Sequence, residues 1–126
     1  MDRRELGRRG EEAVAVRLAA RGFAIVARNV RMRRGEIDLV ARRGGVLWFV
    51  ECKCRSRGDV GTPLRALDPR KRAALFAAAR EFVARRRFRG DWGFLAASIV
   101  WEQEGAAPLV AIERLPLGPA AFTRRA

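Results

Sequence analysis

Two strand-like segments on either side of the pair Gly44-Gly45 constrain the fold of this chain most strongly. Residues 36–41 alternate polar and apolar side chains with a period of two, and residues 46–50 form an apolar run that continues to Arg55. Adjacent glycines suit a tight turn, because glycine adopts positive φ angles at little steric cost. The pattern therefore predicts a β-hairpin.

The rest of the chain predicts two helices and three further strands. The helices are expected over about residues 6–21 and 69–87, and the strands over 23–29, 92–101 and 109–115. Asp68 is a suitable N-cap for the second helix, with Pro69 in its first turn. A length of 126 residues supports one core, and no repeat or linker interrupts it. We therefore expect a single α/β domain over residues 1–126, with a sheet of about five strands and flanking helices.

The hairpin register brings ionisable side chains together. A two-residue turn at Gly44-Gly45 places Asp38 opposite Glu51 and Glu36 opposite Lys53, on one face of the paired strands. Opposed carboxylates repel each other, and a divalent cation such as Mg²⁺, which takes oxygen ligands, would remove the repulsion. An ordinary polar hairpin face with loose ion pairs explains the spacing of these residues equally well.

The charge of the chain indicates a polyanionic partner. The formal net charge is +13, and 27 residues are Lys or Arg. Basic side chains gain affinity for nucleic acid by releasing counterions from phosphates. A GC-rich genome would also enrich arginine, and only Lys53 and Lys71 are lysines. A lysine retained between Glu51 and Arg55 in such a chain suggests a site that prefers a compact ammonium group.

The residue types that are missing exclude several chemistries. The chain contains no His and no Tyr, so Ser-His and Cys-His catalysis, imidazole zinc sites and tyrosine nucleophiles are excluded. Cys52 and Cys54 point to the same face of a strand, so we expect small buried hydrophobes and no disulfide. No apolar run is long enough to cross a membrane, and no apolar signal region follows the charged N-terminus. A cytoplasmic location is expected.

Several short motifs occur in the order seen in the YraN family of bacterial proteins, which this sequence resembles over about residues 7–83. The motifs are Gly7-x-x-Gly10-Glu11, Arg28-Asn29-x-Arg31, Gly35-Glu36-Ile37-Asp38-Leu39-Val40, Phe49-Val50-Glu51-Cys52-Lys53-Cys54-Arg55 and Asp68-x-x-Lys71-Arg72. That family is largely uncharacterised and resembles PD-(D/E)xK endonucleases, including archaeal Holliday-junction resolvases. The resemblance implies a restriction-endonuclease-like core of three layers around a mixed sheet.

The same resemblance implies roles for the clustered residues. Asp38 and Glu51 would bind the metal, and Lys53 would be the catalytic lysine. Glu11 on the first helix matches an acid that points toward the metal site, although an acid early in a helix is also favoured by the helix dipole. Glu36 would support the site by binding metal, orienting Lys53 or holding a turn.

Four further basic residues are candidates for phosphate contacts, although each could equally be a solvated surface residue. They are Arg31, Arg55, Lys71 and Arg72.

These observations favour an endonuclease that depends on Mg²⁺ or Mn²⁺ and hydrolyses phosphodiester bonds of DNA, with branched or otherwise structured DNA among the candidate substrates. A non-catalytic nucleic-acid-binding protein with the same fold is the main alternative, and a basic protein that docks on RNA or ribosomes is a third. DNA is favoured over RNA, and no membrane partner is expected. A two-fold homodimer would suit a junction or duplex, and the sequence leaves the oligomeric state open.

Overall fold

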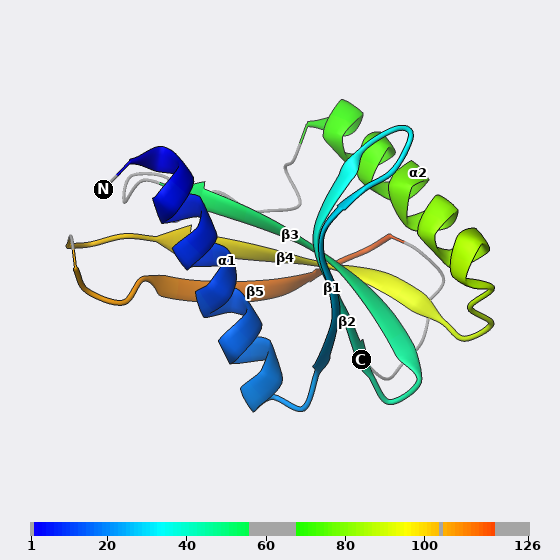
Figure 1. Ribbon diagram of the computed structural model, residues 1–126, viewed down its shortest axis with the longest axis horizontal. Helices are drawn as coiled ribbons and strands as arrows, with labels where there is room; N and C mark the ends of the chain where they lie inside the picture. The colour runs from blue at the N-terminus through cyan, green and yellow to red at the C-terminus, as the bar shows by residue number, and fades with distance from the viewer. Residues whose placement is uncertain (1, 56–67, 104, 118–126) are drawn as a thin grey trace.

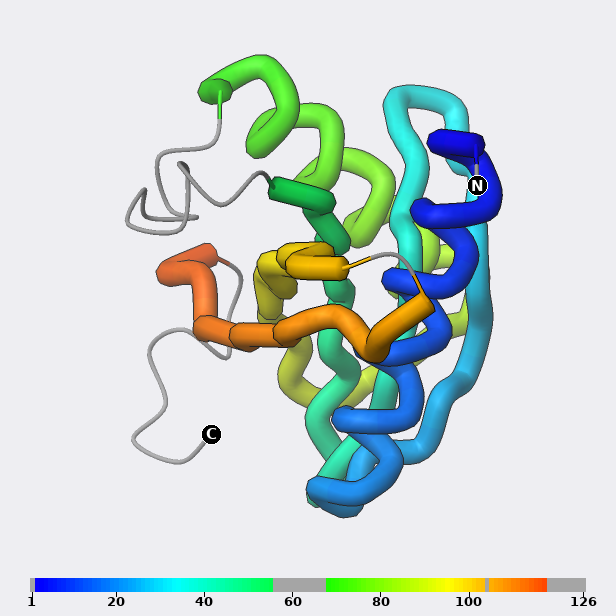
Figure 2. Tube along the Cα trace, turned by 90° about the vertical axis from the view of Figure 1, so that its left-hand side faces the viewer, coloured from blue at the N-terminus to red at the C-terminus, as the bar shows by residue number. Residues whose placement is uncertain are grey.

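A five-stranded mixed sheet forms the middle layer of the protein (Figures 1 and 2). The computed structural model describes residues 2–55, 68–103 and 105–117. Its elements, in chain order, are α1 (Arg3–Ala20), β1 (Ala24–Arg31), β2 (Glu36–Arg43), β3 (Val46–Arg55), α2 (Pro69–Arg86), β4 (Trp92–Val100) and β5 (Leu109–Leu115).

The strands follow one another across the sheet in the order β1-β2-β3-β4-β5. β3 and β4 are parallel, and the other three neighbouring pairs are antiparallel. The parallel pair needs a crossover connection, which contains α2 (Figure 1). The expected α/β fold with a mixed sheet of five strands is confirmed, and it is compatible with a three-layer nuclease-like core.

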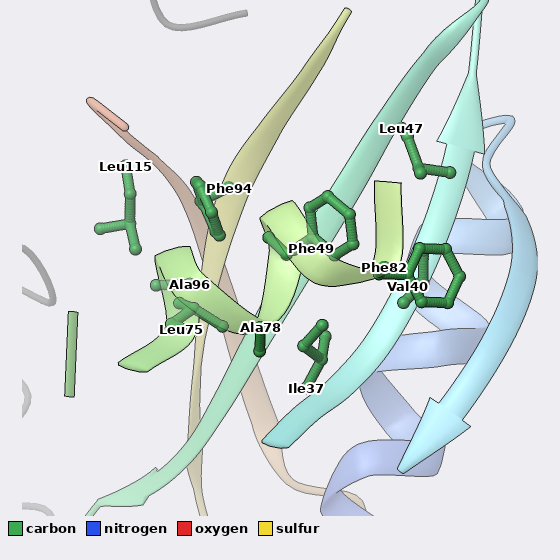
Figure 3. Close-up of a cluster of buried hydrophobic side chains, with 11 residues drawn as sticks. Ile37, Val40, Leu47, Phe49, Leu75, Ala78, Phe82, Phe94, Ala96 and Leu115 are labelled. Carbon is green, nitrogen blue, oxygen red and sulfur yellow. The ribbon is translucent and has the colours of Figure 1, made fainter. Parts of the chain in front are cut away.

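The two helices cover opposite faces of the sheet because the side chains of β3 alternate. Leu47 and Phe49 belong to a buried cluster with α2, whereas Trp48 and Val50 belong to a second cluster with α1. We call these the α2-side cluster and the α1-side cluster. Figure 3 shows the α2-side cluster, in which Phe49 meets Phe82 edge to face with ring centroids 5.6 Å apart. The protein therefore has two apolar layers, one on each side of the sheet.

Local signals at the helix ends explain how well the sequence predicted these elements. α2 starts where expected, and the Asp68 carboxylate accepts a hydrogen bond from the Arg70 backbone N–H at 2.8 Å. α1 begins earlier than the expected residue 6, because Asp2 caps it by accepting from the Glu5 N–H at 2.9 Å.

Two expectations about strand residues need correction. The first strand continues past Asn29 to Arg31, because pairing with β2 holds it in the sheet. Both cysteines are free, as expected, and Cys52 is half-buried against the α1-side cluster. Cys54 is exposed rather than buried, because it lies at the end of β3 and at the rim of that cluster.

Neither helix in the described parts of the chain combines the length and the hydropathy that crossing a membrane would require.

Candidate active site

β2 and β3 are paired over only part of their length and then separate. The clustered acids lie at the point of separation, which we call the division of the sheet. The ladder between these strands runs from Arg43↔Val46 to Leu39↔Val50, which is the register expected from the Gly44-Gly45 turn. Past that last pair, β3 remains hydrogen-bonded to β4, and β2 remains hydrogen-bonded to β1. The predicted meeting of Asp38 and Glu51 therefore occurs where the two strands separate.

The second predicted pair, Glu36 with Lys53, is not formed. Lys53 is aligned instead with Ser98 of β4. Glu36 forms an ion pair with Arg31 at 2.9 Å, across the β1–β2 ladder. The expectation was wrong because it extended the hairpin ladder beyond the point where β2 and β3 diverge.

Asp38 bridges the division with its side chain. Its carboxylate Oδ2 accepts a hydrogen bond from the backbone N–H of Cys52, at 2.7 Å. This backbone group faces the open side of β3, where β2 no longer supplies a carbonyl partner. The bond holds the Asp38 carboxylate beside β3, next to Glu51.

A bend in β1 lies opposite Asp38. The β1–β2 register passes from Arg28↔Leu39 to Val30↔Ile37 across Asn29, whose φ is 49°. Asparagine tolerates this left-handed conformation better than most residues. The register therefore places the bend in β1 and Asp38 in β2 at the same level of the sheet.

The bend changes which face of the sheet the flanking residues meet. Ala27 and Val30 both pack against the α2-side cluster, and so do Val40 and Ile37 on β2. Residues three apart on a regular strand would point to opposite faces. Asp38 thus sits where both strands change face.

A cavity of about 270 Å³ lies at this point. Its lining consists of Glu36, Asp38, Glu51, Lys71, Ala74 and Leu75. The first three residues come from the hairpin strands and the last three from the first turns of α2. The cavity is therefore shared between the hairpin and the crossover helix.

Burial and the repulsion of nearby carboxylates raise the pKa of Asp38 and of Glu51. Burial raises the pKa of Glu51 to about 7, and the nearby Asp38 carboxylate adds to the shift. Burial also raises the pKa of Asp38, against the opposing effect of the hydrogen bond from Cys52. Two carboxyl groups that are costly to ionise together form a setting that a cation would stabilise.

Glu11 approaches the same acids from α1. It is half-buried, and burial followed by the Asp38 charge raises its pKa. Glu11 does not line the cavity of about 270 Å³. The residue before it is the buried Gly10, where an added Cβ would lie 3.0 Å from Ile99 Cδ1. This close contact of α1 with β4 sets the height of Glu11 above the sheet.

A second glycine brings α2 close to the start of β2. A Cβ at Gly35 would lie 2.9 Å from the carbonyl oxygen of Ala74, so only glycine allows this approach. Ala74 lines the cavity together with Lys71. Gly35 therefore helps to place the helix residues of the cavity against Asp38.

The two lysines occupy different positions around the acids. Lys71 lines the cavity, and its charge lowers the pKa of both Asp38 and Glu51. Lys53 lies exposed near the end of β3, and its charge also lowers the pKa of Glu51, after that of Lys71. Reasoning from sequence placed only Lys53 among the acids, although the rarity of lysine singled out both residues.

The other basic candidates lie around the site. Arg31 is on the surface in its ion pair with Glu36, and Arg55 is half-buried at the end of β3. Arg72 lines a neighbouring groove of about 480 Å³ on the outer side of α2. None of these three arginines lines the acid cavity.

The donor set suits a hard divalent cation that keeps open positions. Within residues 2–55, 68–103 and 105–117, no three acidic or thiol side chains form a group that could hold a metal ion. Mg²⁺ typically takes one or two carboxylates and completes its shell with waters and substrate phosphates. Asp38 and Glu51 would supply such a pair, since both line the same cavity.

Comparison with known proteins identifies the family to which the chain belongs. A model of the uncharacterised protein family UPF0102 matches residues 10–94, about two thirds of the chain. The chain belongs to this family. UPF0102 is the YraN family that the motifs indicated, so that resemblance is confirmed. The matched range includes all the residues that line the acid cavity.

Curated UPF0102 proteins from distant bacteria are similar to this chain. A protein of Symbiobacterium thermophilum is 49% identical over 82 residues, which are 65% of this chain and 70% of the relative. One of Sorangium cellulosum is 41% identical over 115 residues, 88% of this chain and 80% of the relative. One of Leifsonia xyli is 43% identical over 88 residues, 70% of this chain, and the match spans 66% of that relative, just under two thirds. These names assign no activity.

Proposed function

We propose that this UPF0102 protein is a metal-dependent endonuclease that hydrolyses phosphodiester bonds of DNA. The observation that carries the proposal is the meeting of Asp38, Glu51 and Lys71 around one cavity, at the division between β2 and β3. Carboxylates that can hold a metal ion, beside an ammonium group that can stabilise developing negative charge, suit metal-assisted phosphoryl chemistry. The net charge of +13 supports a polyanionic substrate.

Asp38 and Glu51 would hold Mg²⁺ or Mn²⁺, and Glu11 would support the cation from the α1 side. A cation bound there would supply Lewis acidity toward a phosphoryl oxygen. Lys71 and Lys53 flank the acids and would stabilise the negative charge that develops on the phosphate. The exposed pair Arg31–Glu36 borders this arrangement.

The resemblance of the YraN family to PD-(D/E)xK endonucleases, which include Holliday-junction resolvases, favours branched DNA as the substrate. A dimer would present two such cavities to a junction or a duplex, so a homodimer belongs to the proposal.

A nicking assay tests the proposal. Purified protein is incubated with supercoiled plasmid and with a synthetic four-way junction, in Mg²⁺, in Mn²⁺ and in EDTA. Asp38→Asn and Glu51→Gln keep the shape of each side chain, and Glu12→Gln on the exposed side of α1 is the matched control. We expect cleavage by the wild type and the control only when metal is present. Equal cleavage by the Asp38 or Glu51 variants would trace the activity to a contaminant and reject the assignment.

A non-catalytic nucleic-acid-binding protein is the second candidate function. It is favoured by the basic charge, which does not depend on the acids, and by the lack of a three-ligand metal group in the described residues. Calorimetric titration with Mg²⁺ and Mn²⁺ separates the two candidates. The nuclease proposal expects binding that Asp38→Asn weakens, whereas absence of metal binding together with DNA binding supports the second candidate.

A further inference from the structure

A basic groove runs along the outer side of α2, next to the acid cavity. One part, of about 480 Å³, has Arg34, Arg72 and Arg80 in its lining beside apolar residues that include Phe76 and Leu117. Another part, of about 530 Å³, includes Arg33, Arg34, Arg80 and Arg85. The two parts share Arg34, Ala77 and Arg80, so they adjoin each other along α2, and together we call them the α2 groove.

The connection between β1 and β2 forms the second wall of this groove. The Met32 N–H donates to the Gly35 carbonyl at 2.9 Å, which closes the connection into a turn. The Arg33 N–H donates to the Glu81 carboxylate on α2, also at 2.9 Å. Together with the close contact at Gly35, these bonds fix the turn against the helix, so the wall that carries Arg33 and Arg34 is built into the fold.

The arginines of the α2 groove differ in their ion pairs. Glu81 is the acidic residue of its lining, and it pairs with Arg85 at 2.7 Å. Among the residues that the structure describes, no acidic side chain forms an ion pair with Arg34 or Arg80. Both side chains are exposed. Two guanidinium groups thus line the groove, Arg34 from the β1–β2 connection and Arg80 from α2.

We infer that the α2 groove binds the phosphate backbone of a nucleic acid and leads it to the acid cavity, an inference that rests on the proposed function. Lys71 lines the cavity and the adjacent Arg72 lines the groove, so both sites use residues of the same turn of α2. From Lys71 to Arg85 the helix measures about 21 Å at its usual rise. At about 3.4 Å per nucleotide, this length matches roughly six nucleotides of one strand.

Arginine suits this role better than a general surface charge would. The guanidinium fork donates two parallel hydrogen bonds to phosphate oxygens, and its weak hydration lowers the cost of the contact. Repeated phosphates along a strand can meet Arg34, Arg80 and Arg85 in succession, whereas a single small anion would use only one of them. The ligand class is therefore a polymer of phosphodiesters.

Salt-dependent DNA binding in EDTA tests the inference without using cleavage. The affinity of a fluorescent 20-base-pair duplex is measured by anisotropy from low to moderate NaCl. The variants are Arg34→Ala and Arg80→Ala, and Arg21→Ala at the far end of α1 is the control of equal charge. Each groove variant is expected to lower the slope of log K against log salt by about one, and to weaken binding roughly eightfold at 0.1 M salt. Arg80→Lys should restore the slope more than the affinity.

If the slope of log K against log salt is the same in the groove variants and in the Arg21 variant, the inference that the α2 groove binds DNA is wrong. The proposed function would be unaffected by that result. Absence of wild-type binding would overturn both. Competition by polyglutamate that equals competition by unlabelled DNA would also contradict a phosphate site. Unchanged thermal unfolding of the variants, expected because both side chains are exposed, verifies that a loss of affinity is not a loss of fold.

Discussion

The carboxylate of Asp38 on β2 accepts a hydrogen bond from the backbone N–H of Cys52 on β3, at 2.7 Å, where the ladder between the two strands has ended. A side chain thus replaces the carbonyl that a neighbouring strand would supply. This single contact ties a proposed metal ligand to the strand that carries Glu51. It also gives Asp38 a structural role that can be separated from its charge.

Replacing Asp38 in two ways should separate those roles. Asp38→Asn keeps an oxygen acceptor for the Cys52 N–H and removes the repulsion with Glu51, so we expect stability at or above that of the wild type. Asp38→Ala leaves that N–H without its partner, and should be less stable than Asp38→Asn by about 1–3 kcal/mol. Urea unfolding in EDTA measures the difference. Equal stability of the two variants would show that water serves the Cys52 N–H as well as Asp38 does.

Glu51 should make the protein less stable as pH rises. Its pKa is raised from 4.5 to about 7 in the folded state, so between these values the unfolded chain releases this proton while the folded chain keeps it. The contribution of Glu51 to stability therefore falls from about pH 4.5 to about pH 7 and stays low above that. Glu51→Gln cannot ionise at this position and so avoids this loss of stability. The free energy of unfolding of the variant, relative to that of the wild type, should therefore increase between pH 5 and pH 8.

Unfolding midpoints in metal-free buffer at several pH values measure this effect. Glu12→Gln, on the exposed side of α1, is the control and should show no such growth. A constant difference between Glu51→Gln and the wild type across the range would contradict the raised pKa.

Lys71 should matter more to the acids than Lys53 does. Of the two lysines, Lys71 lowers the pKa of Glu51 more strongly, and it lines the cavity. Lys71→Met is therefore expected to raise the Glu51 pKa further than Lys53→Met, as measured by NMR titration of the carboxyl carbon in metal-free protein. In the nicking assay, loss of Lys71 should reduce the rate by about a hundredfold or more, the scale of removing one charge-stabilising donor. If Lys53→Met changes both the Glu51 pKa and the nicking rate more than Lys71→Met does, Lys53 is the main charge-stabilising lysine of the site.

Two glycines provide a matched test of how α2 is placed. Gly35→Ala would put a Cβ 2.9 Å from the Ala74 carbonyl oxygen, and should destabilise the protein by about 1–3 kcal/mol and lower any cleavage activity. Gly7→Ala meets no atom within 4 Å and lies inside α1, so it should stabilise the protein by about 0.5–1 kcal/mol. The thermal unfolding midpoints of the two variants and the wild type measure these differences in stability. A harmless Gly35→Ala would mean that α2 can shift without cost.

The sequence by itself determined the elements and the hairpin register. Alternation over residues 36–41, the Gly44-Gly45 turn and the Asp68 cap are local signals, and each acts within a few residues of its position. Those signals were enough to bring Asp38 and Glu51 to the same level of two adjacent strands. They also extended the ladder too far, because the local pattern of a hairpin does not show where its two strands stop pairing.

Only the tertiary structure decided how the site is completed. Past Val50, β3 is paired with β4, which follows the crossover helix, and the place of Lys71 depends on the contact of Gly35 with Ala74. Both contacts join residues far apart in the chain, so no local periodicity encodes them. Asp38 was therefore predictable as an acid opposite Glu51, whereas its bond to Cys52 follows from long-range packing that separates the two strands.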